Sequence, residues 1–132
     1  MRGTAAEVLT PTGAVVPVHA SVEDAERRLA TLGVSELYVL DPDGQLAGVL
    51  PDYDLLKRRL EGNGRAICAG ELMSRVELRA SCSTPLRELA MHMRQSSRSR
   101  IPVVANGRLI GEVTRVSMLR HLRSGRGLAL VR

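Results

Sequence analysis

The sequence predicts an α+β fold built from two copies of one β-α-β-β-α repeat. Three observations lead to this prediction. The second half of the chain repeats the pattern of the first half at a nearly constant shift. Each half contains a segment with helical periodicity of apolar residues. Each half also places a turn dipeptide between two short apolar runs, as in a β-hairpin.

The repeat can be followed along most of the chain. At a shift of 64, residues 7–10 (Glu-Val-Leu-Thr) fall on residues 71–74 (Glu-Leu-Met-Ser). The shift becomes 63 after the hairpin, because residues 41–44 (Asp-Pro-Asp-Gly) correspond to the shorter run 105–107 (Ala-Asn-Gly). Two copies with one deletion in a turn indicate duplication. The predicted organisation is repeat 1 at residues 1–63, repeat 2 at residues 64–125 and a C-terminal tail at residues 126–132.

Each copy opens with a short extended segment, at residues 14–18 and 76–79. A helix follows, because its apolar residues recur at the spacing of a single helical stripe. That stripe consists of Val22, Ala25, Leu29 and Leu32 in copy one, and of Leu86, Leu89, Ala90 and Met93 in copy two.

Two short strands then meet at a tight turn. The dipeptides Asp43-Gly44 and Asn106-Gly107 predict this turn, because these residue types tolerate positive φ. The sequence therefore predicts a β-hairpin in the same place in both copies.

A last helix closes each copy. It begins at Asp52 or Thr114, both good N-cap residues, and runs to Gly62 or Gly125, where glycine stops a helix. One copy alone is too small to bury its sheet and its helices. We therefore expect the two copies to pack together.

Composition restricts the class of protein. Hydrophobic residues make up 44% of the chain but aromatic residues only 2%, so Val, Leu, Ile, Ala and Met must fill the core. No apolar run is long enough to cross a membrane, and no apolar signal segment follows Met1-Arg2. Cys68 and Cys82 form neither a disulfide framework nor a metal motif. We therefore expect a cytoplasmic protein that has no membrane segment and binds no metal.

Charge is distributed unevenly. Residues 1–66 hold seven basic and ten acidic residues, a net charge of −3, whereas residues 67–132 hold twelve Arg and four Glu, a net charge of +8. This asymmetry favours an anionic ligand or partner for the second half, and head-to-tail pairing of two chains. Nucleic-acid binding through the arginines is an alternative, but the scarcity of aromatic residues for base stacking argues against it.

Each copy resembles the CBS domain, named after cystathionine β-synthase. Residues 100–104 (Arg-Ile-Pro-Val-Val) and 107–114 (Gly-Arg-Leu-Ile-Gly-Glu-Val-Thr) carry the resemblance most clearly, and residues 38–41 and 44–49 carry it in copy one. It implies a Bateman module, in which two CBS repeats pack about a pseudo-twofold axis with two clefts between them. Such modules bind adenine nucleotides or adenosyl compounds, form flat homodimers and regulate an attached or partner protein.

The family's ligand pattern is a glycine, a Ser or Thr three positions later, and an Asp three further on. Copy one has Gly48, Pro51 and Asp54, and Glu36 stands where the family often has a basic residue. The resemblance thus implies that Asp54 accepts hydrogen bonds from the ribose hydroxyls. Pro51 has neither a hydroxyl nor an N–H donor, so we expect cleft one to prefer an uncharged or cationic ligand such as S-adenosylmethionine.

Copy two keeps the opposite features. Thr114 supplies the hydroxyl that faces phosphate in the family, and Arg100 is the basic residue. Ser117 replaces the aspartate that binds the ribose. We therefore expect cleft two to bind AMP, ADP or ATP, and to be the better nucleotide site. The candidate ligand-binding residues are Leu9, Thr10 and Ala14 at the adenine end, with Tyr38, Asp54, Arg100, Ile101, Thr114 and Ser117.

Simpler explanations exist for the three main candidates. Thr114 is explained as an N-cap, Asp54 as an acid favoured by the helix dipole, and Arg100 as a surface arginine. No catalytic constellation surrounds any histidine, so we do not expect an enzyme. The predicted function is a ligand-sensing regulatory module, a homodimer with an unknown regulated partner. The alternatives are a ligand-free dimerisation module and a nucleic-acid binder.

Overall fold

The computed structural model describes residues 2–62 and 64–124. The chain forms two compact units, each with its own core. Of the described residues, 13–62 and 64–77 form the first-repeat unit, and 2–12 and 78–124 form the second-repeat unit. Residues 2–12 therefore belong to the unit that is built mainly from the second repeat.

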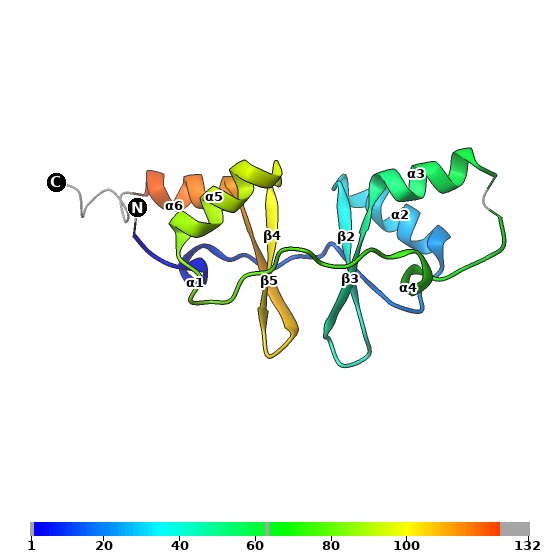
Figure 1. Ribbon diagram of the computed structural model, residues 1–132, viewed down its shortest axis with the longest axis horizontal. Coiled ribbons are helices and arrows are strands. Elements are labelled where there is room, and N and C mark those ends of the chain that lie inside the picture. Colours follow the sequence, from blue (N-terminus) through cyan, green and yellow to red (C-terminus); the bar gives the residue numbers. More distant parts are fainter. Residues whose placement is uncertain (1, 63, 125–132) are drawn as a thin grey trace. The chain divides into compact units, whose positions relative to one another are not determined.

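The first-repeat unit has a three-stranded sheet in the order β1-β2-β3. Strand β2 pairs in parallel with β1 and antiparallel with β3. Helices α2, α3 and α4 lie on one face of this sheet (Figure 1). The bounds are β1 Val15–Pro17, α2 Val22–Leu32, β2 Glu36–Leu40, β3 Leu46–Pro51, α3 Asp52–Leu60 and α4 Ala69–Leu72.

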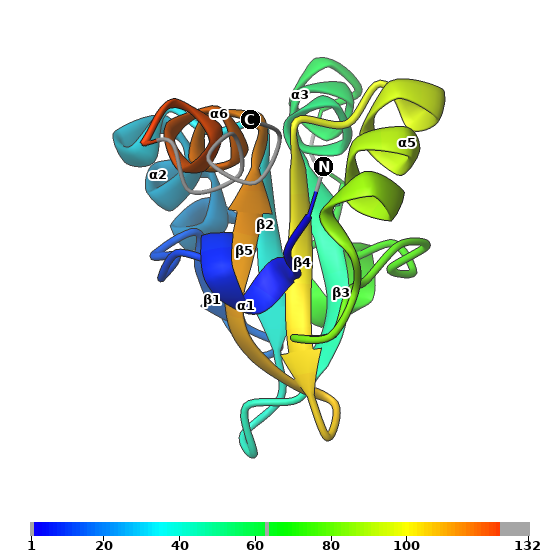
Figure 2. The ribbon, with the colours of Figure 1, turned by 90° about the vertical axis from the view of Figure 1, so that its left-hand side faces the viewer.

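The second-repeat unit has the same plan with a smaller sheet. Strands β4 and β5 form an antiparallel pair, and α1 crosses beside them below α6 (Figure 2). The bounds are α1 Ala5–Val8, α5 Leu86–Ser96, β4 Arg100–Ala105, β5 Arg108–Thr114 and α6 Arg115–Arg123. Val, Leu, Ile, Ala and Met fill the main core clusters of both units, as composition predicted.

The opening segment of the second repeat differs from the prediction. Residues 76–79 form no strand, and only Ala80 makes a parallel bridge, to Val103. The following residues turn at once, since Ser81 N donates to Thr84 Oγ1 at 2.9 Å and Thr84 N donates to Ser81 O at 3.1 Å. This polar turn ends the pairing after one residue.

Both predicted hairpin turns are confirmed. Gly44 and Gly107 have φ of +81°, and Asn106 has φ of +52°. The second turn thus has two consecutive residues at positive φ, which suits the twist of a hairpin.

The start of the last helix follows the prediction in one copy only. The Thr114 hydroxyl accepts a hydrogen bond from Ser117 N at 2.9 Å and caps α6. In α3 the N-cap is Pro51, so the expected N-cap Asp52 is instead the first helical residue. Helix α3 ends at Leu60. The expected stop at Gly125 and the tail at residues 126–132 lie outside the described residues.

Two glycines allow the segments that follow the short helices α1 and α4 to cross closely over a strand of the sheet. A Cβ on Gly48 would lie 2.8 Å from Ser74 O, and a Cβ on Gly111 would lie 2.7 Å from Thr10 O. Backbone hydrogen bonds hold each crossing, between Ser74 and Val49 and between Thr10 and Glu112. These crossings place α4 next to β3, and α1 next to α6. They therefore form one wall of each pocket described below.

Candidate functional site

Each unit has a pocket between the helix that follows its β-hairpin and a short four-residue helix. The first pocket has a volume of about 510 Å³ and lies between α3 and α4. The second pocket has a volume of about 270 Å³ and lies between α6 and α1. The first is lined by Asp54, Lys57, Arg58, Glu61, Gly64 and Leu72. The second is lined by Glu7, Val8, Leu9, Thr10, Ser117, Arg120, His121 and Ser124.

The two pockets occupy equivalent positions of the repeat. At the shift of 63 established by the sequence, Asp54 corresponds to Ser117, and Glu61 corresponds to Ser124. The ribose position of the family pattern therefore faces the pocket in both units. Duplication has kept the pocket, whereas the side chains that line it have diverged.

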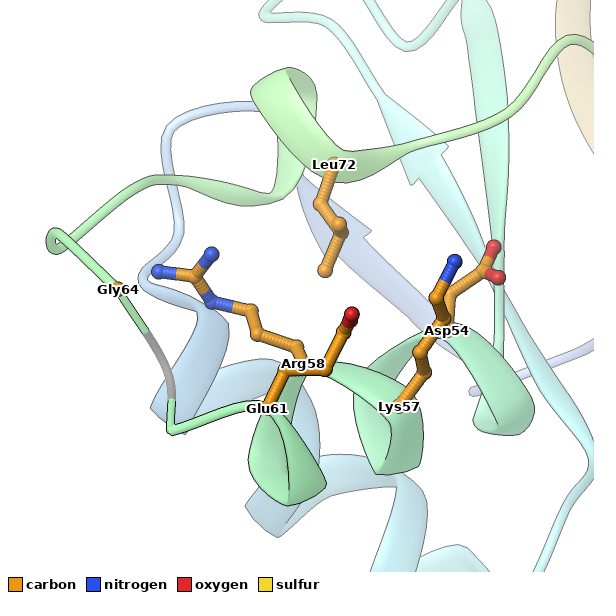
Figure 3. A pocket seen from close by; sticks show the side chains of 6 residues that line it. All are labelled: Asp54, Lys57, Arg58, Glu61, Gly64 and Leu72. Atoms are coloured by element: carbon orange, nitrogen blue, oxygen red, sulfur yellow. The ribbon is translucent and has the colours of Figure 1, made fainter.

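In the first pocket, α3 supplies most of the polar groups (Figure 3). Asp54 is in the first turn of the helix, and the carboxylate of Asp54 makes no hydrogen bond or ion pair with another described residue. Lys57 and Arg58 follow three and four residues later, so they lie on the same side of the helix as Asp54. Leu72 projects from α4 and forms an apolar wall. The pocket thus combines an uncommitted acid, two cations and an apolar surface, with Lys57 on the Asp54 side and Arg58 pointing toward Gly64 (Figure 3).

The loop segment 64–68 lies at the far end of this pocket, where Gly64 is one of the lining residues. Arg58 donates to the backbone oxygen of Arg65. Arg65 in turn forms an ion pair with Glu71 at 2.9 Å between Nη2 and Oε2. The backbone N–H of Cys68 donates to Glu71, and this bond, with Arg65, holds the pKa of Glu71 below its usual range. The loop is therefore tied to both α3 and α4.

In the second pocket the equivalent hydroxyl is already committed. Ser117 Oγ accepts from Thr114 N and donates to Thr114 O, both at 3.0 Å. Farther along α6, the side chain of His121 is only 5% exposed, and its Nε2 lies 3.9 Å from Oε2 of Glu7. The second pocket, which is also the smaller of the two, therefore has fewer polar groups available to a ligand.

Arg100 lies against an acid of the neighbouring strand. Its Nε and Nη2 lie 2.9 Å and 2.8 Å from Oε1 of Glu112. Both side chains are nearly buried, at 11% and 12% exposed. The positive charge that the sequence analysis assigned to a phosphate is thus balanced within the sheet. Arg115, another arginine of the basic second half, donates to the backbone oxygen of Arg98.

The structure brings together some of the predicted ligand-binding residues. Leu9, Thr10 and Ser117 line the second pocket, and Asp54 lines the first. Three others are buried and line neither pocket: Ala14, Tyr38 and Ile101.

The two cations of the first pocket lie beyond the family's ligand pattern, which ends at Asp54, and were therefore not predicted as ligand-binding residues. The helical spacing rule could have found Lys57 and Arg58, because residues three and four positions apart share a helix face.

Two expected absences can be examined in the described residues. Across residues 2–62 and 64–124, no group of three His, Cys, Asp or Glu side chains is placed to hold a metal ion. In the same residues, no helix has the length and apolar character needed to span a membrane.

The CBS domain family matches this sequence twice, at residues 5–61 and 69–124. The chain belongs to the CBS domain family. The α+β architecture agrees with this assignment, because the similar solved structures are CBS-pair proteins. As a CBS pair, the chain is of a kind that is generally regulatory.

Three similar proteins illustrate the range of the family. The structure of CBSX2, a CBS-pair protein of Arabidopsis thaliana, in complex with AMP is 33% identical, with a TM-score of 0.79 over 92% of this chain and 97% of that chain. Hypoxic response protein 1 of Mycobacterium tuberculosis is 25% identical over 90% of this chain and 85% of that protein. The A-adding tRNA nucleotidyltransferase of Geobacter sulfurreducens is 26% identical over 92% of this chain. The chain spans only 14% of the length of that enzyme.

Proposed function

We propose that this chain is a regulatory CBS module whose first pocket binds an adenine nucleotide or adenosyl compound. The observation that carries the proposal is the carboxylate of Asp54, which faces a pocket of about 510 Å³. Pockets that hold small molecules have volumes of roughly 300–1,000 Å³. A carboxylate can accept two charge-assisted hydrogen bonds from neighbouring ribose hydroxyls. AMP in the complex of the similar CBSX2 supports an adenosine-containing ligand.

The proposal changes the order of preference between the two sites. The sequence alone favoured the second cleft, because Thr114 and Arg100 match the phosphate features. In the structure Thr114 Oγ1 accepts the Ser117 N–H and Arg100 pairs with Glu112. Neither Thr114 nor Arg100 lines the second pocket, and the Ser117 hydroxyl that does line it is already bonded to Thr114, so we propose the second pocket as the weaker site.

Calorimetric titration of AMP and adenosine against the wild type and Asp54→Asn tests the proposal. Asn keeps the size of the side chain but loses the charge, so we expect both ligands to bind at least about tenfold more weakly. Ser117→Ala, at the equivalent position of the second pocket, is the matched control and should leave the tighter binding unchanged. Unchanged affinity in Asp54→Asn would exclude the first pocket as the site.

We also propose that the module forms a homodimer through α3 and α6. Large apolar side chains are exposed on α3 and α6, and exposed apolar patches mark interaction surfaces. Light scattering of the wild type and of Leu56→Glu tests this, with a dimer expected to become a monomer. A monomeric wild type would contradict it. The exposed side chains are Tyr53, Leu56, Leu60, Val116 and Leu119.

The regulated partner and the cytoplasmic location remain proposals. Cys68 and Cys82 are both free thiols, which is compatible with a reducing compartment. If the module regulates a partner, AMP should change the affinity between the two proteins, because binding free energies are reciprocally coupled.

A further inference from the structure

The geometry points to a second property of the first pocket, which rests on the proposed function. We propose that Lys57 and Arg58 hold the phosphate of the ligand, so that this pocket selects nucleoside phosphates over uncharged or cationic adenosyl compounds. This assignment reverses the ligand preference expected from the sequence. There the absence of a hydroxyl at Pro51 and the acid at Glu36 argued against a phosphate.

The position of the two cations fits such a ligand. Lys57 and Arg58 lie about one helical turn from Asp54, at a rise of about 1.5 Å per residue along α3. A nucleotide whose ribose hydroxyls face Asp54 has its 5′-phosphate on the other side of the same sugar ring. In the proposed assignment the phosphate points toward the C-terminal half of α3, away from Pro51, because Lys57 and Arg58 supply the positive charge of the pocket there. Phosphate binding at this end of the pocket does not need the hydroxyl that copy one lacks.

Both cations have donors available for a phosphate. Lys57 is exposed and makes no ion pair or side-chain hydrogen bond with another described residue. Arg58 is half-buried and donates through Nη2 to the backbone oxygen of Arg65. A guanidinium has five N–H donors, so this bond occupies only part of its capacity. The same bond restrains Arg58 at the pocket, which lowers the conformational entropy lost on binding.

Glu61 is the counterpart that limits phosphate affinity. It lines the same pocket from just beyond the end of α3 (Figure 3). With Asp54 directed at the ribose, the carboxylate of Glu61 is the remaining negative charge among the lining residues. The pocket therefore offers a phosphate two positive charges and one negative charge. In the second pocket, the equivalent positions hold Arg120, His121 and Ser124.

Titration of AMP and adenosine into the full chain at low salt tests the assignment. In the wild type we expect AMP to bind at least about tenfold more tightly than adenosine, as a charge-assisted contact implies. In Lys57→Gln this preference should fall several-fold, while the affinity for adenosine stays the same. Lys57→Arg should retain the preference, and Glu61→Gln should increase it.

Arg59→Gln is the matched control. Arg59 carries the same charge on the same helix, but its guanidinium is paired with Glu26 of α2 through two contacts, at 3.0 and 3.2 Å. Arg59→Gln should leave the ratio of AMP to adenosine affinity within about twofold of the wild type, because the charge of Arg59 is already neutralised by Glu26.

The outcomes separate this assignment from the proposed function. If adenosine and AMP bind equally well, the phosphate assignment is wrong and the proposed function stands. If neither ligand binds, both are wrong. If AMP is preferred but Lys57→Gln and Arg58→Gln both keep the full preference, other groups hold the phosphate and the assignment is again wrong.

Discussion

Substitution of Gly48 by Ala tests how the first pocket is built. A Cβ at this position would lie 2.6 Å from Met73 Sδ and 2.8 Å from Ser74 O. The methionine side chain can rotate away, but the Ser74 oxygen belongs to the backbone. It accepts a hydrogen bond from Val49 N at 2.9 Å, and Ser74 N donates to Val49 O at 2.8 Å.

The cost of this substitution can be worked out along two routes. If the crossing segment stays in place, the overpacked contact costs about 1–3 kcal/mol. If the segment moves away, the two backbone hydrogen bonds are lost, at about 1 kcal/mol each. The cheaper route decides, so Gly48→Ala should lower the free energy of unfolding by about 2 kcal/mol. Because Leu72 directly precedes this segment, AMP affinity should fall as well.

Urea unfolding monitored by circular dichroism measures the loss. Gly13→Ala is the control, because a Cβ there meets no atom closer than 3.5 Å and its φ lies outside the positive region. It should change the free energy of unfolding by less than about 0.5 kcal/mol. A loss below about 0.5 kcal/mol in Gly48→Ala, or an equal loss in both variants, would refute the close-approach argument.

Three further predictions concern stability. Arg100→Met leaves the charge of the nearly buried Glu112 uncompensated and should lower the free energy of unfolding in urea by about 3 kcal/mol. The double variant Arg100→Met/Glu112→Leu should recover most of this loss. An equally unstable double variant would contradict this. Thr114→Ala removes the cap of α6 and should cost about 1 kcal/mol by the same measurement, and no loss would show that the cap is unimportant. The pKa of Glu71 is lowered in the folded chain, so its stabilising contribution is present above the unfolded value of about 4.3 and is lost as pH falls through the folded value. Glu71→Gln should therefore lose less stability than the wild type on acidification below about pH 4.3, and parallel pH profiles would argue against it.

Most of the fold could be predicted from the sequence because it depends on local signals. Positive φ at Asn106 and Gly107 follows from the residue types alone, and so does the hairpin turn that these two residues form. The register of the repeat also identified Asp54 and Ser117 as equivalent positions, and both line equivalent pockets. These features need no knowledge of contacts between distant residues.

The remaining features depend on such contacts. Arg100 matches a phosphate-binding base in sequence, but its pairing with Glu112 depends on the register of two antiparallel strands. The crossing of Thr10 over Gly111 joins residues about a hundred positions apart, and no local pattern predicts it. This crossing also explains why the compact units differ from the sequence repeats, because residues 2–12 pack with the second repeat.

A crystal structure of the chain with AMP tests the central claim most directly. The account predicts AMP in the first pocket, with its ribose hydroxyls hydrogen-bonded to Asp54 and its phosphate beside Lys57 and Arg58. AMP bound only beside Ser117 in the second pocket would contradict it.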